Sequence, residues 1–358
     1  MTTASPSHPD KILVVRLSAV GDVVRTIPAV QALRRHYPDS IIHWLVEDRC
    51  SELLVGLSGI DELRIVPRRE WKQMGTIQQI AGFCNLVRSL RAEQYDLYMD
   101  YHGILKSGMY GAMSRIPRRI GYPKGIAKEW NILFNNEILP PHDAHMSRYV
   151  RNLLLTRYLD PAATEERPGL PLTDADHGFA ADFLNRNGLG NRPFIFLYPG
   201  TSPRGRYKRW EPVRYAEVVD RLADMGWTTL IGWGPGEEPI VAEIRGSTRG
   251  EPLVPPLTTL KQLAAFIDRA SLFIGGDTGP MHMASMLGTP VVTLFGPSDP
   301  VINEPARFTP FRIVYAGVDC SPCRKKRCKA LECMDKITVD MVMDAVCNLL
   351  AAGSTSSQ

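Results

Sequence analysis

The alternation of short apolar runs with segments of helical periodicity restricts the fold of this chain more than any other feature. An apolar, β-branched run at 12–15 precedes a helical segment at about 23–36, and the same order recurs at 194–198 and 212–225. Neighbouring parallel strands need a crossover connection, which is usually a helix. The alternation therefore predicts an α/β fold with parallel sheets covered by helices.

The chain of 358 residues is long for one domain, and the pattern restarts midway. The stretch 159–174 contains Pro161, Pro168 and Pro171 and few large apolar side chains, as is typical of a linker. We therefore predict two domains, 1–165 and 166–358. Further strands are expected at 41–46, 97–101, 228–232, 272–274 and 291–295, and further helices at 77–91, 260–269, 280–287 and about 338–351.

The loop after the predicted strand at 272–274 is the first candidate binding site. Two glycines are followed by Asp277, Thr278 and Gly279, and Pro280 suits the first position of a helix. The N-terminus of such a helix binds anions through its backbone N–H groups and its dipole. With His282 one turn further on, the segment predicts a phosphate site; a tight turn without a ligand is the alternative.

The loop PGTSPRGRYKRW at 199–210 follows another predicted strand and is strongly basic. Thr201 and Ser202 offer hydroxyl groups, and a diphosphate would suit the cations Arg204, Arg206, Lys208 and Arg209. A solvated basic loop is the alternative interpretation. The next strand is followed by GWGPGEE, which could place Glu237 or Glu238 near a ribose.

The loop RLSAVGDVV after the first strand has a single glycine, Gly21, followed by Asp22. Gly21 permits a sharp turn, so that Asp22 can project from the end of the strand. A carboxylate there would repel a phosphate but would suit an alcohol that must lose its proton. Asp22 is therefore a candidate general base, and an N-cap of the following helix is the alternative.

Several classes of protein lack support in the sequence. We find no GxGxxG fingerprint after a leading strand, no P-loop and no GxSxG motif. The net charge of +4 does not by itself argue for nucleic acid. The first ten residues have no apolar core of a signal peptide, and no apolar run reaches the length of a membrane span. We expect a cytoplasmic protein that meets a membrane only at its surface.

The segments VVRLSAVGDVVRTIPAVQALRRHYP, IHWLVE and GGDTGPMHMASMLGTPVVTLFGPSDP together resemble glycosyltransferase family 9, the ADP-heptose:lipopolysaccharide heptosyltransferases. YKRW is similar to the KxW element of that family, and HGILKSG and RRIGY stand where it has related segments. The resemblance covers most of the chain, and the combination of SxxGDV with DTGxxH is specific. It implies a GT-B fold, with two Rossmann-like domains facing across a cleft.

The resemblance also implies roles for individual residues. The C-terminal domain would bind the nucleotide-sugar ADP-heptose, and the N-terminal domain would bind an anionic lipid-linked saccharide. Asp22 would be the catalytic base, and Lys106, Arg118 and Arg119 would meet acceptor carboxylates or phosphates. The implied nucleotide-sugar contacts are Thr201, Ser202, Lys208, Glu237, Asp277, Thr278, Gly279 and His282. The transfer would invert the anomeric carbon and need no cofactor, at the cytosolic face of the inner membrane.

Four cysteines, Cys320, Cys323, Cys328 and Cys333, lie within fourteen residues. Such a cluster could bind a structural zinc ion, remain as free thiols or form disulfides. The interleaved basic residues also permit a small nucleic-acid-binding knuckle, but no basic domain surrounds them. For the whole chain, the alternatives to a heptosyltransferase are a family member with another donor and acceptor, and a catalytically silent nucleotide-binding protein.

Overall fold

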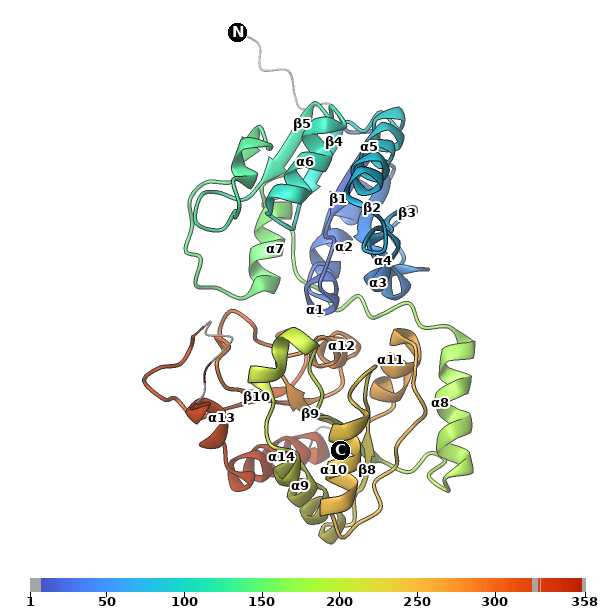
Figure 1. Ribbon diagram of the computed structural model, residues 1–358, viewed down its shortest axis with the longest axis vertical. Coiled ribbons are helices and arrows are strands. Elements are labelled where there is room, and N and C mark those ends of the chain that lie inside the picture. Colours follow the sequence, from blue (N-terminus) through green and yellow to red (C-terminus); the bar gives the residue numbers. More distant parts are fainter. Residues whose placement is uncertain (1–7, 324–327, 329, 356–358) are drawn as a thin grey trace. The chain divides into compact units, whose positions relative to one another are not determined.

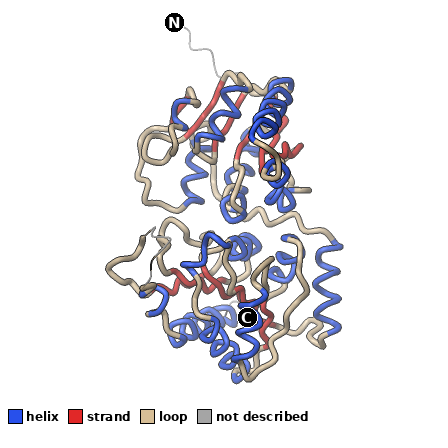
Figure 2. The backbone as a smooth tube through the Cα atoms, viewed as in Figure 1, coloured by secondary structure: helices blue, strands red, loops and turns tan. Residues whose placement is uncertain are grey.

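The computed structural model describes residues 8–323, 328 and 330–355, and the chain divides into two compact units, Met1–Pro171 and Leu172–Gln358. Each unit contains one parallel sheet with helices on its faces (Figures 1 and 2). The predicted α/β architecture is confirmed. The units divide within the proline-containing stretch 159–174, six residues beyond the predicted domain boundary.

The sheet of the first unit has the strand order β3-β2-β1-β4-β5-β6, and all of its paired strands are parallel. Its strands are β1 (Lys11–Val15), β2 (Ile41–Glu47), β3 (Glu62–Val66), β4 (Leu97–Asp100), β5 (Arg118–Gly121) and β6 (Glu137–Ile138). The central strands β1 and β4 are almost fully buried, because helices cover both faces. The order reverses between β1 and β4, where loops from their carboxyl ends diverge and leave room for a ligand.

The helices of the first unit are α1 (Val20–Val24), α2 (Ile27–His36), α3 (Asp48–Ser51), α4 (Arg68–Trp71), α5 (Thr76–Ala92), α6 (Leu105–Met113) and α7 (Arg148–Arg157), with 3₁₀ turns at Glu52–Leu54 and Asn131–Leu133. The single helix predicted at 23–36 is wrong in one respect, because it is two helices separated at Arg25 and Thr26. The ring of Pro28 is incompatible with a helical carbonyl at Val24, which explains the interruption.

The sheet of the second unit has the order β11-β10-β9-β7-β8 and is also parallel. Its strands are β7 (Phe194–Tyr198), β8 (Thr228–Ile231), β9 (Leu272–Gly276), β10 (Val291–Phe295) and β11 (Phe311–Tyr315). β9, β7 and β8 are adjacent, and Tyr198 at the end of β7 pairs with Gly275. The loops that follow these three strands therefore emerge at one edge of the sheet.

The helices of the second unit are α8 (Asp174–Arg186), α9 (Pro212–Asp224), α10 (Glu238–Ser247), α11 (Leu260–Asp268), α12 (Gly279–Leu287), α13 (Glu332–Asp335) and α14 (Val339–Thr355), with a 3₁₀ turn at Pro203–Lys208. α9 and α14 pack together on one core, and α8 packs on α11. None of the helices that the structure describes has the length and apolarity needed to cross a membrane.

Candidate active site

The first unit places Asp22 beside the end of its central strand pair. β1 ends at Val15, which pairs with Asp100 at the end of β4, and the chain then continues into α1. Asp22 lies in the first turn of α1, whose N-cap is Ala19 rather than Asp22. The alternative interpretation of Asp22 as the helix cap is therefore excluded by the structure.

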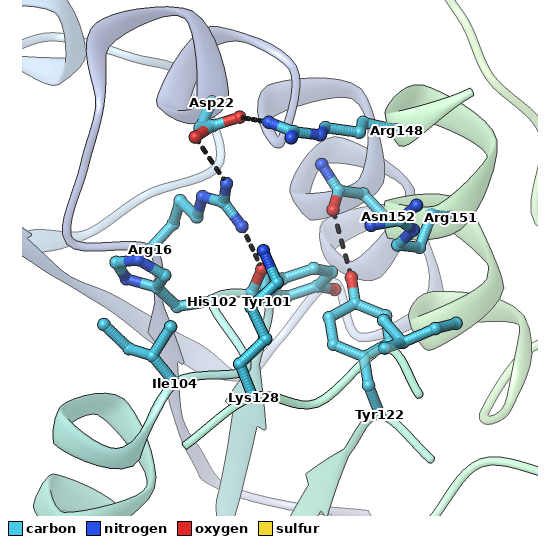
Figure 3. Close-up of a pocket in the computed structure, with 11 residues that line it drawn as sticks. Arg16, Asp22, Tyr101, His102, Ile104, Tyr122, Lys128, Arg148, Arg151 and Asn152 are labelled. Atoms are coloured by element: carbon cyan, nitrogen blue, oxygen red, sulfur yellow. Dashed lines mark hydrogen bonds and ion pairs between the residues drawn. The ribbon is translucent and has the colours of Figure 1, made fainter. Parts of the chain in front are cut away.

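Three arginines surround the carboxylate of Asp22 instead. Arg16 Nη2 lies 2.9 Å from Oδ2, and Arg148 Nη1 lies 2.7 Å from Oδ1. Arg25 forms a further ion pair with Oδ1. Figure 3 shows the guanidinium groups of Arg16 and Arg148 at different oxygens of the Asp22 carboxylate. We call this arrangement of Asp22 with Arg16, Arg25 and Arg148 the arginine clamp.

The clamp determines the charge of Asp22. Burial acts to raise the pKa of this carboxyl, but the charges of Arg16, Arg25 and Arg148 outweigh burial and hold the pKa well below its usual value. Asp22 is consequently ionised throughout the neutral range. Its negative charge in turn allows three guanidinium groups to converge within one small region.

Asp22 lines a pocket of about 140 Å³ in the first unit (Figure 3). The pocket has a strongly basic wall, since Asp22 is its one acid among the described residues. The cations that line it are Arg16, Lys128, Arg148 and Arg151. The other lining residues are Tyr101, His102, Ile104, Tyr122, Ile126 and Asn152. The composition suits a polar anion with hydroxyl groups.

Hydrogen bonds fix the walls of this pocket. The amide of Asn152 on α7 donates to the Arg25 carbonyl at 3.0 Å and accepts from the Tyr122 hydroxyl at 3.0 Å. His102 Nδ1 accepts from the Leu17 N–H at 3.2 Å, so the neutral ring carries its proton on Nε2. Burial lowers the pKa of His102 to about 3, and this ring therefore stays neutral.

The buried carboxyl of Asp100 shapes the loop that carries His102. It accepts hydrogen bonds from the backbone N–H groups of His102 and Gly103, from the Ser107 hydroxyl and from the Asn131 amide. Burial raises the pKa of Asp100, although these hydrogen bonds oppose the shift. Asp100 thus organises one wall of the pocket from beneath.

The predicted acceptor-binding residues lie elsewhere in the first unit. Lys106 on α6 stands 3.8 Å from Glu47 and over the rings of Trp71 and Tyr110, and it does not line the Asp22 pocket. Arg118 and Arg119 begin β5, opposite the start of β4, and thus lie at the edge of the sheet away from Asp22.

Both arginines are also engaged where they stand. Arg118 forms a two-point ion pair with Glu137, with distances of 2.6 and 3.0 Å. The Arg119 Nε donates to the carbonyl of Phe134 at 2.7 Å. The structure therefore does not bring Arg118 and Arg119 together with Asp22.

The second unit brings together most of its predicted residues at the common edge of β9, β7 and β8. Lys208 Nζ lies 2.6 Å from Asp277 Oδ2, and His282 Nε2 lies 3.8 Å from the other oxygen, Oδ1. Thr278 is the N-cap of α12, and Gly279 is its first residue. The N–H groups at the start of α12 thus stand beside the cation of Lys208, an arrangement suited to a diphosphate.

Thr201 and Glu237 have structural partners at this site. The Thr201 hydroxyl accepts a hydrogen bond from Arg209 Nε at 2.9 Å, and Ser202 is exposed at the start of the 3₁₀ turn. Glu237 is buried, and its Oε2 accepts from the Tyr198 hydroxyl and the Gly234 N–H, both at 2.9 Å. Burial raises the pKa of Glu237.

The predicted metal centre at the cysteine cluster is not seen among the residues that the structure describes. Cys333 is buried, and the other three cysteines are more exposed. Burial raises the pKa of the Cys333 thiol, and the neighbouring cysteines act in the same direction. Among the described residues no group of three or more His, Cys, Asp or Glu side chains is placed to hold a metal ion, so the predicted zinc site has no support. All seven cysteines are free.

Reasoning from the sequence missed the cations closest to Asp22. Arg148 and Arg151 come from α7, more than 120 residues later, and no local pattern marked them. The sequence offered a signal for Arg16, because this residue directly follows β1 in the same loop as Asp22. In the second unit, Tyr198 was assigned no role, and Arg209 was predicted as a cation for a diphosphate but not as the hydrogen-bond partner of Thr201.

Two Rossmann-like units with charged residues at their strand ends are the architecture of the GT-B glycosyltransferases, and solved structures confirm this fold. The glycosyltransferase of family 9 from Veillonella parvula matches with a TM-score of 0.83 at 21% identity, over 96% of this chain and 98% of that one. The Escherichia coli ADP-heptose lipopolysaccharide heptosyltransferase II matches with a TM-score of 0.74 at 22% identity, over 96% of this chain and 99% of that one.

Sequence relatives identify the family. Residues 83–334 match the family model described as "Glycosyltransferase family 9 (heptosyltransferase)". Lipopolysaccharide heptosyltransferase 3 of Escherichia coli K12 is 28% identical over 299 residues, which cover 80% of this chain and 82% of the relative. The chain therefore belongs to glycosyltransferase family 9, and it is a glycosyltransferase.

Proposed function

We propose that this enzyme transfers a heptose from ADP-heptose to the inner core of lipopolysaccharide, with inversion at the anomeric carbon. Membership of the family supports heptosyl transfer. The relatives with lipopolysaccharide heptosyltransferase names support the acceptor class, and the Escherichia coli ADP-heptose enzyme supports the donor. The observation that carries the proposal is the carboxylate of Asp22 at the end of β1, inside a pocket lined by cations.

In the proposed reaction, the acceptor hydroxyl loses its proton to Asp22 while its oxygen bonds to the anomeric carbon of the donor. The bond between that carbon and the diphosphate oxygen breaks on the opposite face, and ADP leaves with the electron pair. Because attack and departure occur on opposite faces, the configuration inverts. Asp22 holds the proton at the end of the step.

The second unit would bind the donor. Lys208 and the N–H groups of Thr278 and Gly279 would contact the diphosphate, with Asp277 and His282 beside them. Negative charge grows on the diphosphate as its bond to the sugar breaks, and a fixed cation with oriented dipoles stabilises that charge. The proposed reaction needs no cofactor, because the chain supplies these positive groups itself.

Other contacts complete the proposed donor site. Thr201 and Ser202 would bond phosphate oxygens, and Glu237 would face the ribose. The first unit would bind the anionic lipid-linked acceptor, and Lys106, which lies on the Asp22 side of the sheet, would assist. Such an acceptor places the enzyme at the cytosolic face of the inner membrane.

Calorimetric titration with ADP and UDP, each with and without EDTA, is the first test. We expect ADP to bind more tightly than UDP and EDTA to change neither affinity. Transfer is then followed by mass spectrometry, with ADP-heptose and heptose-deficient lipopolysaccharide as substrates. Preference for UDP would overturn the assignment of the donor, and a wild-type protein that binds ADP but transfers nothing would overturn the assignment of the acceptor.

A further inference from the structure

The arginine clamp conflicts with the role of Asp22 as a base. A general base works best when its pKa lies near the working pH. The three arginines hold the pKa of Asp22 well below its usual value, and the carboxylate then has little affinity for a proton. Some event must weaken the clamp before Asp22 can accept a proton from an alcohol.

The three arginines differ in how deeply they are buried. Arg25 is 5% exposed, and its Nε also donates to the Gly21 carbonyl at 3.2 Å. Arg16 is 11% exposed and also donates to the Tyr101 carbonyl. Arg148 is the most exposed of the three at 30%, and it belongs to α7 rather than to the strand–helix loop of Asp22. Arg148 is the member of the clamp best placed to change partner.

More cations than acids line the pocket beside the clamp. Arg16, Lys128, Arg148 and Arg151 line it with a single carboxylate. The Nε atoms of Arg16 and Arg151 are buried and have no hydrogen-bond partner in the part of the chain that the structure describes. Buried donors without a partner are costly, so these two side chains gain from any rearrangement that brings them an acceptor.

We propose that this pocket binds an anionic group of the acceptor, a carboxylate or a phosphate, and that Arg148 turns from Asp22 to that group. Asp22 is then released as a base only when the acceptor is in place. The inference rests on the proposed function, and it assigns the anion to Arg148, Arg151 and Lys128 rather than to Arg118 and Arg119.

The release has a physical consequence for water. The described charged and titratable groups around Asp22 are Arg16 after β1, Arg25 after α1, Arg148 and Arg151 on α7, Lys128 on the pocket wall, His102 after β4 and Cys50 on α3. His102 stays neutral and Cys50 stays protonated, because burial lowers the pKa of the first to about 3 and raises the pKa of the second to about 12. Among the described residues, cations therefore control the basicity of Asp22, the three clamp arginines above all, and a clamped Asp22 would not activate water against the donor.

The test is a double-mutant cycle on anion binding by the whole chain, which requires no transfer reaction. Inorganic phosphate and acetate are titrated calorimetrically into the wild type, Asp22→Asn, Arg148→Gln and the double variant. Arg64→Gln is the matched control, because Arg64 also pairs with carboxylates, Glu62 and Glu93, but lies outside the pocket. Circular dichroism verifies that each variant is folded.

We expect Asp22→Asn to tighten binding of at least one anion by about 5-fold or more, because Arg148 no longer has to leave a carboxylate. In the Arg148→Gln background the same change should tighten binding less than about 2-fold. The preferred anion identifies the group as carboxylate or phosphate. Equal tightening in both backgrounds would indicate simple charge repulsion and overturn the proposal, and so would no tightening.

Two further results separate this inference from the proposed function. ADP affinity should be unchanged by Arg148→Gln; an equal loss of ADP and phosphate affinity would assign the pocket to the donor and overturn the inference. In the wild type, donor hydrolysis without acceptor should be slow, and Arg148→Gln should raise it several-fold while it raises the KM for acceptor. A variant that only lost structure would hydrolyse the donor more slowly, and Arg148→Lys should restore part of the transfer.

Discussion

The two units place a carboxylate among positive groups at the carboxyl ends of their strands, but they do so with different surroundings. Asp22 has three arginines and a basic pocket, whereas Asp277 has one lysine at 2.6 Å and one histidine at 3.8 Å. Asp277 also stands at the start of α12, where N–H groups add positive potential. The carboxyl ends of the strands therefore carry an acid held by three guanidinium groups in one unit, and an acid beside a lysine and a helix N-terminus in the other.

The difference shows that the number of cations around an acid determines what it can do. A carboxylate with three guanidinium partners is held ionised and is a weak base until one partner leaves. A carboxylate with one ammonium partner mainly positions that ammonium, and a diphosphate can compete with it for Lys208. The following predictions test this contrast in order of decreasing effect.

The largest effect is expected for Asp22→Asn, which keeps the shape of the side chain but removes the proton acceptor. We predict that kcat for heptosyl transfer falls about 10³-fold, within the range of general base catalysis. ADP affinity should stay within about 2-fold, since Asp22 belongs to the other unit. Asp182→Asn on the exposed face of α8 is the control and should leave kcat unchanged. An Asp22→Asn variant with normal kcat would show that Asp22 is only an ion-pair partner.

The next effect is expected for Lys208→Met, which preserves the aliphatic stem and removes the charge. We predict about a 10²-fold loss of kcat, because charge on the leaving diphosphate is no longer stabilised. Unlike Asp22→Asn, this change should also weaken ADP binding, by about 10-fold. Steady-state kinetics and calorimetry measure the two quantities. A loss of kcat with ADP affinity intact would place Lys208 away from the diphosphate.

A smaller effect is expected for the stability of the Asp22→Asn variant. Asp22→Asn should lower the free energy of unfolding by about 1–2 kcal/mol, because it leaves three arginines without their counter-charge. The pKa of Asp22 is lower in the folded chain than the ordinary value of about 3.9, so its contribution is complete above that pH. This stabilising contribution of Asp22 should be lost as the pH falls through the pKa of Asp22 in the folded chain. Thermal melting of both proteins between pH 2 and 8 measures this, and a stability gap that widened as the pH fell from 5 toward 2 would contradict the direction of the shift.

The smallest effect is expected for Glu237→Gln. Burial raises the pKa of Glu237, so the folded chain holds its proton more tightly than the unfolded chain. The wild type should therefore lose stability as the pH rises through the folded pKa, and the glutamine variant should not. Between pH 4 and 8 we predict that the Tm of the wild type falls relative to the Tm of the variant. The change in the relative free energy of unfolding should be less than about 1 kcal/mol. A shift of the opposite sign would show that Glu237 is held ionised by Arg209.

Strong local signals explain which parts of the fold were predictable. The predicted strand at 194–198 matches β7, and the predicted helices at 77–91 and 212–225 match α5 and α9 within one residue at each end. These elements have regular apolar periodicity. The strands β3, β5, β6 and β11 were not predicted, since they are only partly buried, and their pairing with neighbours makes them strands.

The sequence alone placed Asp22, Lys208, Asp277 and Thr278 in loops after strands, because chain order decides which residues follow a strand and parallel strands end at one edge. It also predicted an anion site at the start of α12, since a helix N-terminus is a local feature of the chain. Only the tertiary structure decided which charged side chains surround Asp22. α7 brings Arg148 across 126 residues to the carboxylate, while the register of β5 carries Arg118 and Arg119 to the opposite edge of the sheet. Charges act through distance in space, and that distance is set by packing and strand register rather than by position along the chain.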